Sequence, residues 1–241
     1  MFAMKVLALA VLLATSAEAR PVKIERNSKA LEFTYEWSAE AAAVPALDRR
    51  FRTEAAKAYR GALGISAEEQ KIAREQKRDY NPQFYSKQWS TAGQSRGLLS
   101  LQYQLGAFTG GAHPNTSYGA LLWDRRLVRQ IDVGALFLRQ DAFPGLTRIA
   151  YCKALNDERR KRRQGEELSG EFGQCPRYAD LAISPVDKDK DGRFDEVAFV
   201  ASPYTAGPYA EGEYELVPPV TRQLIAAIKP MYRASFEAQR Q

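Results

Sequence analysis

The segment from residue 187 to residue 195 has the residue types and spacing of a calcium-binding loop. It reads Asp-Lys-Asp-Lys-Asp-Gly-Arg-Phe-Asp, with carboxylates at the first, third and fifth positions and glycine at the sixth. A loop of this kind turns sharply while it directs hard oxygen ligands toward one cation. The expected ligands are the carboxylates of Asp187, Asp189 and Asp191, the backbone carbonyl of Arg193, and the carboxylate of Asp195, directly or through water.

The calcium pattern is incomplete at its end. Position twelve, a bidentate glutamate in a helix-loop-helix site, is Ala198 here, and Glu196 comes two residues too early. The residues after the loop alternate as in a strand, so we predict a calcium-supported turn between strands at residues 181–184 and 196–202. The alternative is a solvated hairpin turn whose lysines and arginine partly neutralise the aspartates, because crowded carboxylates repel one another without a cation.

His113 is the single histidine of the chain, so any imidazole chemistry depends on it. It follows two glycines and precedes Pro114 in an expected turn, where its ring can fix the backbone or contact a ligand. Catalysis would require a nucleophile or a metal, and the sequence has neither a Gly-x-Ser-x-Gly elbow nor a second histidine for zinc. We therefore predict no enzymatic activity. A carboxylate pair that hydrolyses glycosidic bonds is the catalytic alternative.

Three tyrosines recur every five residues in a segment rich in glycine and proline. Tyr204, Tyr209 and Tyr214 lie between residues 202 and 219, and their spacing fits neither a helix nor a plain strand. Aromatic rings with exposed hydroxyl groups favour contacts with proteins and carbohydrates, because they bury a large area and keep a hydrogen-bonding tip. The rings can equally fill the core beneath a proline-stiffened loop, so both interpretations stay open.

The segments at residues 110–114 and 203–212, which read Gly-Gly-Ala-His-Pro and Pro-Tyr-Thr-Ala-Gly-Pro-Tyr-Ala-Glu-Gly, carry a family resemblance. The chain resembles the paired extracytoplasmic domains of unknown function found in lysozyme-sensing anti-sigma factors and ahead of the catalytic domain in some peptidoglycan deacetylases. The resemblance implies an exported, non-catalytic cell-envelope module that binds cell-wall glycan or a wall-directed protein such as lysozyme. The expected ligand-contact residues are His113, Tyr204, Tyr209, Glu211, Glu213 and Tyr214.

The resemblance leaves other functions open. The anti-sigma proteins carry a cytoplasmic domain and a membrane span before this module, and the deacetylases carry a catalytic domain after it. Neither is recognised here, so we expect neither sigma-factor regulation nor deacetylation. Typical lysozymes are basic, as this chain is, so lysozyme binding would need an acidic patch, which Glu211, Glu213 and Glu215 could supply. A calcium-stabilised structural envelope protein and a carboxylate-pair hydrolase are the alternatives.

The first nineteen residues have the pattern of a signal peptide. Lys5 provides a short positive start, residues 6–14 are almost wholly apolar, and small residues precede an expected cleavage after Ala19. No later stretch is long and apolar enough to span a membrane as a helix. We expect a periplasmic or secreted protein. Its net charge of +6 then favours anionic envelope polymers, and we expect no nucleic-acid partner.

Cys152 and Cys175 are the two cysteines, and export makes a disulfide between them the expected state. Between them lies the basic run at residues 159–163, which reads Arg-Arg-Lys-Arg-Arg. We expect this run to form the solvated end of a helix, where cations oppose the negative helix pole. Binding of an anionic polymer is the alternative.

The elements that position these residues follow from periodicity. Residues 31–37 alternate as a strand, residues 45–64 form an amphipathic helix that Gly64 ends, and a capping box at Ser66 starts a second helix to about residue 78. Alternation on both sides of a glycine turn at residues 110–111 predicts a hairpin of two antiparallel strands. A later helix begins near Pro144, with its buried face formed by Leu146, Ile149, Ala150 and Leu155.

Strands and helices without strict alternation indicate an α+β fold with antiparallel sheet and packed helices. We predict two closely joined subdomains, at residues 20–109 and 110–241, with the second carrying both segments of the resemblance. The three tryptophans are expected in the core. The contact surface is expected where the turn at residues 110–114 meets the tyrosine segment.

Overall fold

The computed structural model describes residues 19–166 and 170–239, so the expected signal peptide lies outside the described residues except for Ala19. The strands are β1 (Val22–Asn27), β2 (Leu31–Trp37), β3 (Gln83–Gln94), β4 (Leu98–Phe108), β5 (Asn115–Asp124), β6 (Arg129–Ile131), β7 (Ala182–Val186), β8 (Glu196–Ala201) and β9 (Tyr214–Leu216). The α-helices are α1 (Ala39–Ala42), α2 (Pro45–Glu75), α3 (Ala142–Arg162), α4 (Arg222–Ala227) and α5 (Pro230–Arg233). Short 3₁₀ helices are η1 (Val133–Leu136), η2 (Glu171–Gly173), η3 (Tyr178–Asp180) and η4 (Tyr209–Glu211).

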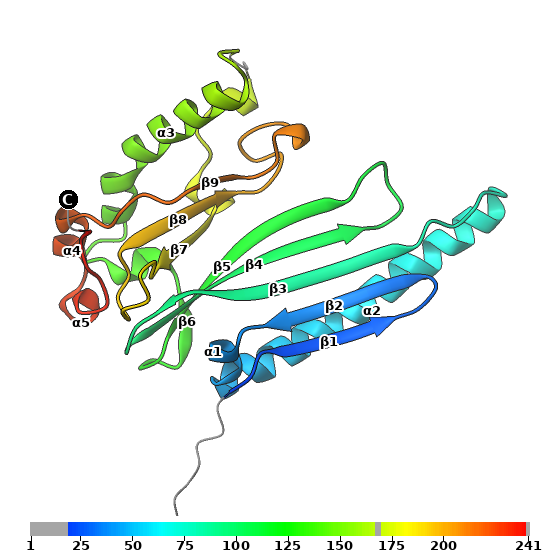
Figure 1. The fold of residues 1–241 in the computed structure, drawn as a ribbon, viewed down its shortest axis with the longest axis horizontal. Helices are drawn as coiled ribbons and strands as arrows, with labels where there is room; N and C mark the ends of the chain where they lie inside the picture. The colour runs from blue at the N-terminus through cyan, green and yellow to red at the C-terminus, as the bar shows by residue number, and fades with distance from the viewer. Residues whose placement is uncertain (1–18, 167–169, 240–241) are drawn as a thin grey trace, which may run out of the picture.

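Among the described residues the strands form two sheets, which confirms the predicted α+β class. The first has six strands in chain order from β1 to β6, and the second has three strands in the order β7, β8, β9 (Figure 1). Neighbouring strands are antiparallel except β2 and β3, which are parallel. A parallel pair requires a long crossover. The helix α2 supplies it and packs against β2.

The helix α2 corrects the predicted division at Gly64. It is one continuous helix of 31 residues, and it runs through both Gly64 and Ser66. The hydroxyl group of Ser66 is buried and contacts the hydroxyl of Tyr80 at 2.9 Å, so it does not cap a new helix. Tertiary packing therefore overrides the local capping pattern. The strands β1 and β3, which the sequence did not predict, flank β2.

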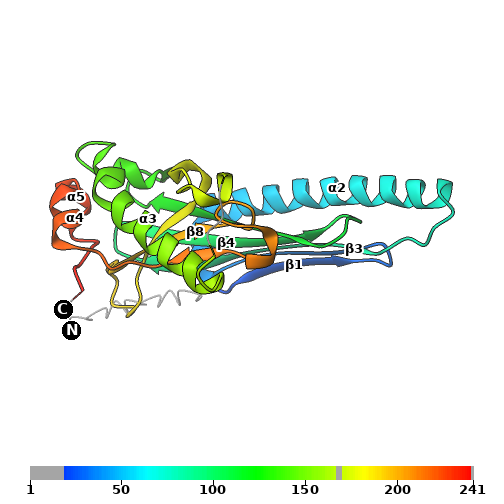
Figure 2. The same ribbon diagram turned by 90° about the horizontal axis from the view of Figure 1, so that it is seen from above.

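The first sheet is covered on both faces. Leu99 and Leu101 of β4 pack in the aromatic core beneath α2, together with the tryptophans at 37, 89 and 123, which confirms that the tryptophans are core residues. Leu98 joins a second core that includes β8 and α3. Because successive side chains of a strand point to opposite faces, α2 and the second sheet lie on opposite faces of the first. In Figure 2, α2 lies along one side of the sheet.

The second sheet is sandwiched between the first sheet and α3. Every residue of β8 is buried, as expected for a strand that is covered on both faces. Phe199 of β8 stacks on Tyr151 of α3, while Ser184 of β7 accepts a hydrogen bond from Gln102 of the first sheet. The predicted strands at 181–184 and 196–202 are thus confirmed as β7 and β8. Ile149 and Ala150 were expected on the buried face of α3, but Ile149 is 86% exposed and Ala150 is exposed as well.

The predicted hairpin is confirmed as β4 and β5, which pair from Leu98 with Asp124 to Ala107 with Asn115. Residue 109 lies in the turn between these two strands. The division into subdomains near this residue stays a prediction. Within the described part of the chain, no helix combines the length and the apolar character needed to cross a membrane.

Candidate functional site

The structure brings the two segments of the resemblance together in an aromatic cluster, by which we mean His113, Tyr204 and Tyr209. His113 lies at the tip of the β4–β5 hairpin, and its ring stacks on Tyr209 at a centroid distance of 3.8 Å. The hydroxyl of Tyr209 donates to the carbonyl of Pro114 at 2.7 Å. Tyr204 lies 5.7 Å from Tyr209 between ring centroids and is 53% exposed. Two segments about ninety residues apart in sequence thus form one surface.

Hydrogen bonds fix the orientation of the histidine ring. Its Nδ1 lies 2.8 Å from the carbonyl of Pro114, which can only accept, so Nδ1 donates. In the neutral ring, Nε2 is then an acceptor for the hydroxyl of Tyr204, 3.4 Å away. The imidazole is therefore part of a hydrogen-bonded aromatic surface. Among the described residues, its hydrogen-bond partners are the carbonyl of Pro114 and the hydroxyl of Tyr204.

The loop that carries the tyrosines holds an unusual backbone. Tyr204 has a φ of 70°, in the left-handed region that non-glycine residues rarely adopt. Gly212 has φ 71° and ψ −154°, a combination that is essentially confined to glycine. Such conformations persist only where the surroundings hold them. One anchor is the Ser202 hydroxyl, which accepts a 3.0 Å hydrogen bond from the backbone N–H of Tyr118 in β5.

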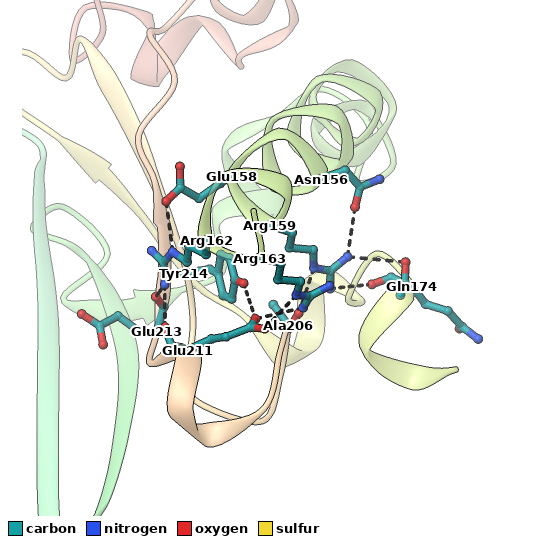
Figure 3. Close-up of polar contacts among 11 residues, drawn as sticks. Asn156, Glu158, Arg159, Arg162, Arg163, Gln174, Ala206, Glu211, Glu213 and Tyr214 are labelled. Carbon is teal, nitrogen blue, oxygen red and sulfur yellow. Dashed lines mark hydrogen bonds and ion pairs between the residues drawn. The ribbon is translucent and has the colours of Figure 1, made fainter. Parts of the chain in front are cut away.

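The basic run at the end of α3 is solvated at Arg160 and Lys161, as predicted, but two of its other arginines hold this loop and correct the prediction there. Arg159 is buried and donates to the carbonyl oxygens of Ala206 and Gln174, at 2.8 Å and 2.9 Å (Figure 3). Arg163 pairs with Glu211 through two hydrogen bonds, of 2.7 Å and 2.9 Å. The two arginines are four residues apart, so they share one face of the helix. The sequence does not single them out, because all five residues of the run are basic.

The predicted contact residues at 211, 213 and 214 lie differently from one another. Tyr214 is fully buried, and its hydroxyl donates to the carboxylate of Glu211, so its ring fills the core. Glu211 is engaged by Arg163, whose hydrogen bonds lower the pKa of that carboxyl group. Glu213 is exposed, and its backbone carbonyl accepts a hydrogen bond from Arg162. Of these three side chains, Glu213 is the one that a large ligand can reach freely.

The aspartate loop, by which we mean residues 187–195, connects β7 to β8 and brings its carboxylates close together. Asp187, Asp189 and Asp195 each place a carboxylate oxygen within 4.8 Å of the others, and Asp189 and Asp191 form a second such group with Glu237. Glu237 comes from the C-terminal segment, and the sequence pattern gave no signal for it. These acidic groups fit the oxygen-rich ligand set that calcium prefers. Whether the carbonyl of Arg193 is a ligand stays a prediction.

The loop also has partners of its own. Backbone N–H groups of Asp191 and Gly192 donate to the two oxygens of Asp187, at 3.1 Å and 3.0 Å. The Arg193 guanidinium lies 2.7 Å from Asp191 and lowers the pKa of that carboxyl group. Burial instead raises the pKa of Asp187. The loop is thus ordered by its own hydrogen bonds, and a cation would add to them by favouring ionised Asp187.

Cys152 and Cys175 form the predicted disulfide, with their Cα atoms 5.6 Å apart. The bond ties α3 to the segment that leads into η3. Arg148 of α3 strengthens this junction, since it donates to the carbonyl oxygens of Pro176 and Cys175. Structural disulfides form in oxidising compartments, so this bond is consistent with an extracytoplasmic location.

No family model matches this sequence, and no curated protein matches it. Solved structures do resemble the fold. A DUF3298 family protein from Pseudomonas aeruginosa PAO1 superimposes with a TM-score of 0.51 at 16% sequence identity, over 88% of this chain and 95% of that chain. A DUF3298 family member from Bacteroides fragilis NCTC 9343 gives a TM-score of 0.50 at 14% identity, over 90% of this chain and 96% of that one.

The chain therefore has a DUF3298-like α+β fold. DUF3298 is the domain family of the lysozyme-sensing anti-sigma factors and the deacetylases, so the resemblance stated from the sequence is supported as a likeness of fold. At these identities the likeness carries no ligand and no activity to this chain.

Proposed function

We propose that this protein is a non-catalytic binding module of the cell envelope, in the periplasm or outside the cell, that contacts cell-wall glycan through the aromatic cluster. The observation that carries the proposal is the meeting of His113, Tyr204 and Tyr209 on one partly exposed surface. Tyrosine suits this task because the ring gives a large apolar area and the hydroxyl keeps a polar tip for sugar hydroxyls. The rings are held in advance, so little conformational entropy is lost on binding.

Charge favours glycan over lysozyme as the partner. A basic partner would need a strong acidic patch on this basic chain. Glu211, which was expected in that patch, is paired with Arg163, and its side chain is only 14% exposed. Glu213 and Glu215 remain exposed. The weakened patch makes a wall-directed protein such as lysozyme the second candidate partner.

The test is a thermal melt of the oxidised protein with soluble peptidoglycan fragments, and in parallel with lysozyme. A ligand that binds only the folded state raises the melting temperature. We expect a rise with the fragments that Tyr204→Ala removes, while Ile149→Ala, which also truncates an exposed apolar side chain, keeps it. A rise in melting temperature with lysozyme but not with the fragments would indicate that the partner is a protein and not glycan. No rise, or release of new reducing ends from the fragments, would contradict the proposal.

A calcium-stabilised structural role is a second candidate, favoured by the buried carboxylates of Asp187 and Asp195 in the aspartate loop. We expect calcium to raise the melting temperature over a chelator-treated sample, and magnesium to act more weakly because it prefers to keep its waters. Asp189→Asn should reduce the calcium effect, since Asp189 belongs to both carboxylate groups. Equal melting temperatures with calcium and with chelator would contradict this role.

A further inference from the structure

The strand β5 has an open edge beside a groove. The short strand β6 pairs only with Leu122, Trp123 and Asp124 of β5, so residues 115–121 have no neighbouring strand on that side. A groove of about 530 Å³ runs along this edge, between β5 and residues 178–183. Its volume lies in the range of roughly 300–1,000 Å³ typical of ligand sites. Natural proteins usually cover or protect such an edge, because its free backbone groups pair readily with another chain.

The backbone groups that face the groove follow from the ladder. In an antiparallel pair, alternate residues direct both N–H and C=O away from the neighbouring strand. The N–H of Tyr118 bonds to Ser202, outside the first sheet, whereas the N–H of Arg125 donates to Gly97 just before β4, so the residues of β5 with even numbers point away from β4. Ala120 is one of them. Its outward N–H has no hydrogen-bond partner among the described residues.

The walls of the groove are apolar and acidic. Leu122, Ile131 and Phe143 contribute apolar surface. The charged side chains that line the groove are Asp132 and Asp180, and no lysine or arginine lines it. Asp180 is paired with an arginine outside the groove, whereas Asp132 is exposed and forms no ion pair among the described residues.

Two further acidic groups act on Tyr118, which lines the groove, although they do not line it themselves. Burial and the nearby charges of Glu213 and Glu215 raise the pKa of Tyr118 to about 12. The surroundings of the groove are thus acidic, although the chain as a whole is basic. This local charge selects for a cationic occupant.

We propose that the groove binds an extended, cationic peptide segment of a partner protein, which adds as a strand to the open edge of β5 in line with β6. The peptide backbone bonds to the N–H and C=O of Ala120 and to the C=O of Tyr118. Alternate side chains then point toward the apolar wall, and a basic side chain reaches Asp132. Strand addition gives affinity through the main chain and specificity through alternate side chains.

The test uses a capped hexapeptide of alternating lysine and valine, with the glutamate–valine version as its control, and nitrogen-15-labelled protein observed by NMR. We expect the lysine peptide to bind and the Ala120 amide hydrogen to exchange about tenfold more slowly at saturation. Asp132→Lys should weaken binding about tenfold, which corresponds to about 1.4 kcal/mol. Ala120→Pro, which removes the outward donor and spares the β4 ladder, should abolish binding.

The controls keep this test separate from the glycan proposal. Tyr204→Ala leaves peptide binding unchanged, because its ring belongs to the aromatic cluster. If Ala120→Pro does not fold, two other measurements test the proposal: the peptide affinity of Asp132→Lys and the protection of the Ala120 amide in the wild-type protein. Absence of binding in the millimolar range, equal binding of the glutamate peptide, or binding without protection of the Ala120 amide would each overturn the proposal.

Discussion

At the scale of single residues, the pair of Arg163 and Glu211 helps to hold the loop that carries the proposed contact surface. Their side chains are 7% and 14% exposed, and the two hydrogen bonds of the pair are 2.7 Å and 2.9 Å long. A nearly buried pair adds little over an apolar contact, but removing one partner leaves a buried charge without compensation. The conformation of the loop thus depends on two side chains that the sequence presents as ordinary surface charges.

We expect Arg163→Ala to lower the free energy of unfolding by about 3 kcal/mol, because it leaves the carboxylate of Glu211 unpaired. Arg160→Ala is the matched control. Arg160 is 57% exposed and pairs with Asp157 on the same helix, so its loss should cost less than about 1 kcal/mol. Urea denaturation of the three proteins measures both effects. Equal losses in the two variants would show that the buried pair has no special role.

The same pair gives stability a defined pH dependence. Arg163 holds the pKa of Glu211 below its ordinary value in the folded state. The folded protein therefore binds this proton more weakly than the unfolded chain, and stability rises with pH across that interval. The contribution is complete above the unfolded pKa, about 4.3, and is lost as pH falls through the depressed folded value. We expect the stability difference between wild type and Glu211→Gln to shrink as pH falls below about 4. A difference that stays constant down to pH 2 would contradict this assignment.

At the scale of elements, substitution by alanine should change stability in opposite directions at two glycines. The first, Gly64, lies within the continuous helix α2. A Cβ atom added at Gly64 meets nothing within 4 Å, so Gly64→Ala should stabilise the protein by about 0.5–1 kcal/mol. At Gly119 of β5 the added Cβ would overlap the ring of Tyr103. Gly119→Ala should therefore be destabilising. Thermal melts of the two variants and the wild type measure both effects. A loss of stability in Gly64→Ala would favour two helices divided at this residue.

The elements also show what the sequence could predict. The strand at residues 31–37 was found because it has one buried face and a clear alternation, and the β4–β5 hairpin was found because apolar residues alternate on both sides of a glycine turn. The strand β3 was missed because polar residues lie on both of its faces. The helix boundary was wrong because the capping box at Ser66 is real in sequence but is outweighed by packing against Tyr80.

The candidate site divides in the same way. His113 and the tyrosines were recognised by their residue types, and their meeting could be expected only from the family resemblance. The arginines that fix the loop looked like a solvated charge run, because sequence shows the charge of a side chain but not the carbonyl groups that it will meet. Arg159, for example, donates hydrogen bonds to the carbonyl groups of Ala206 and Gln174, which are 47 and 15 residues away in the sequence.

At the scale of the whole molecule, the two sheets approach each other very closely at Gly93. Gly93 of β3 is buried against the start of the aspartate loop, and a Cβ atom there would lie 2.6 Å from the Cβ of Asp187 and 3.0 Å from the ring of Phe194. The N–H of Asp187 donates to the carbonyl of Ala92 next to it, at 3.1 Å. On the far side, Tyr232 near the C-terminus donates to Asp124 of β5 at 2.7 Å. The layers therefore share both a core and buried hydrogen bonds.

This sharing predicts that the wild-type protein unfolds in a single cooperative transition, in which amides of β4 and β8 lose protection together in hydrogen exchange. Gly93→Ala should lower the stability of the molecule, because Asp187 and β3 must move apart to admit the methyl group. It should also make β8 exchange before β4, since the first sheet keeps its own core beneath α2. Gly111→Ala is the control, as nothing lies within 4 Å of an added Cβ there. Two separate transitions in the wild type, with the second sheet unfolding first, would show that the layers are independent units and that the contact at Gly93 does not couple them.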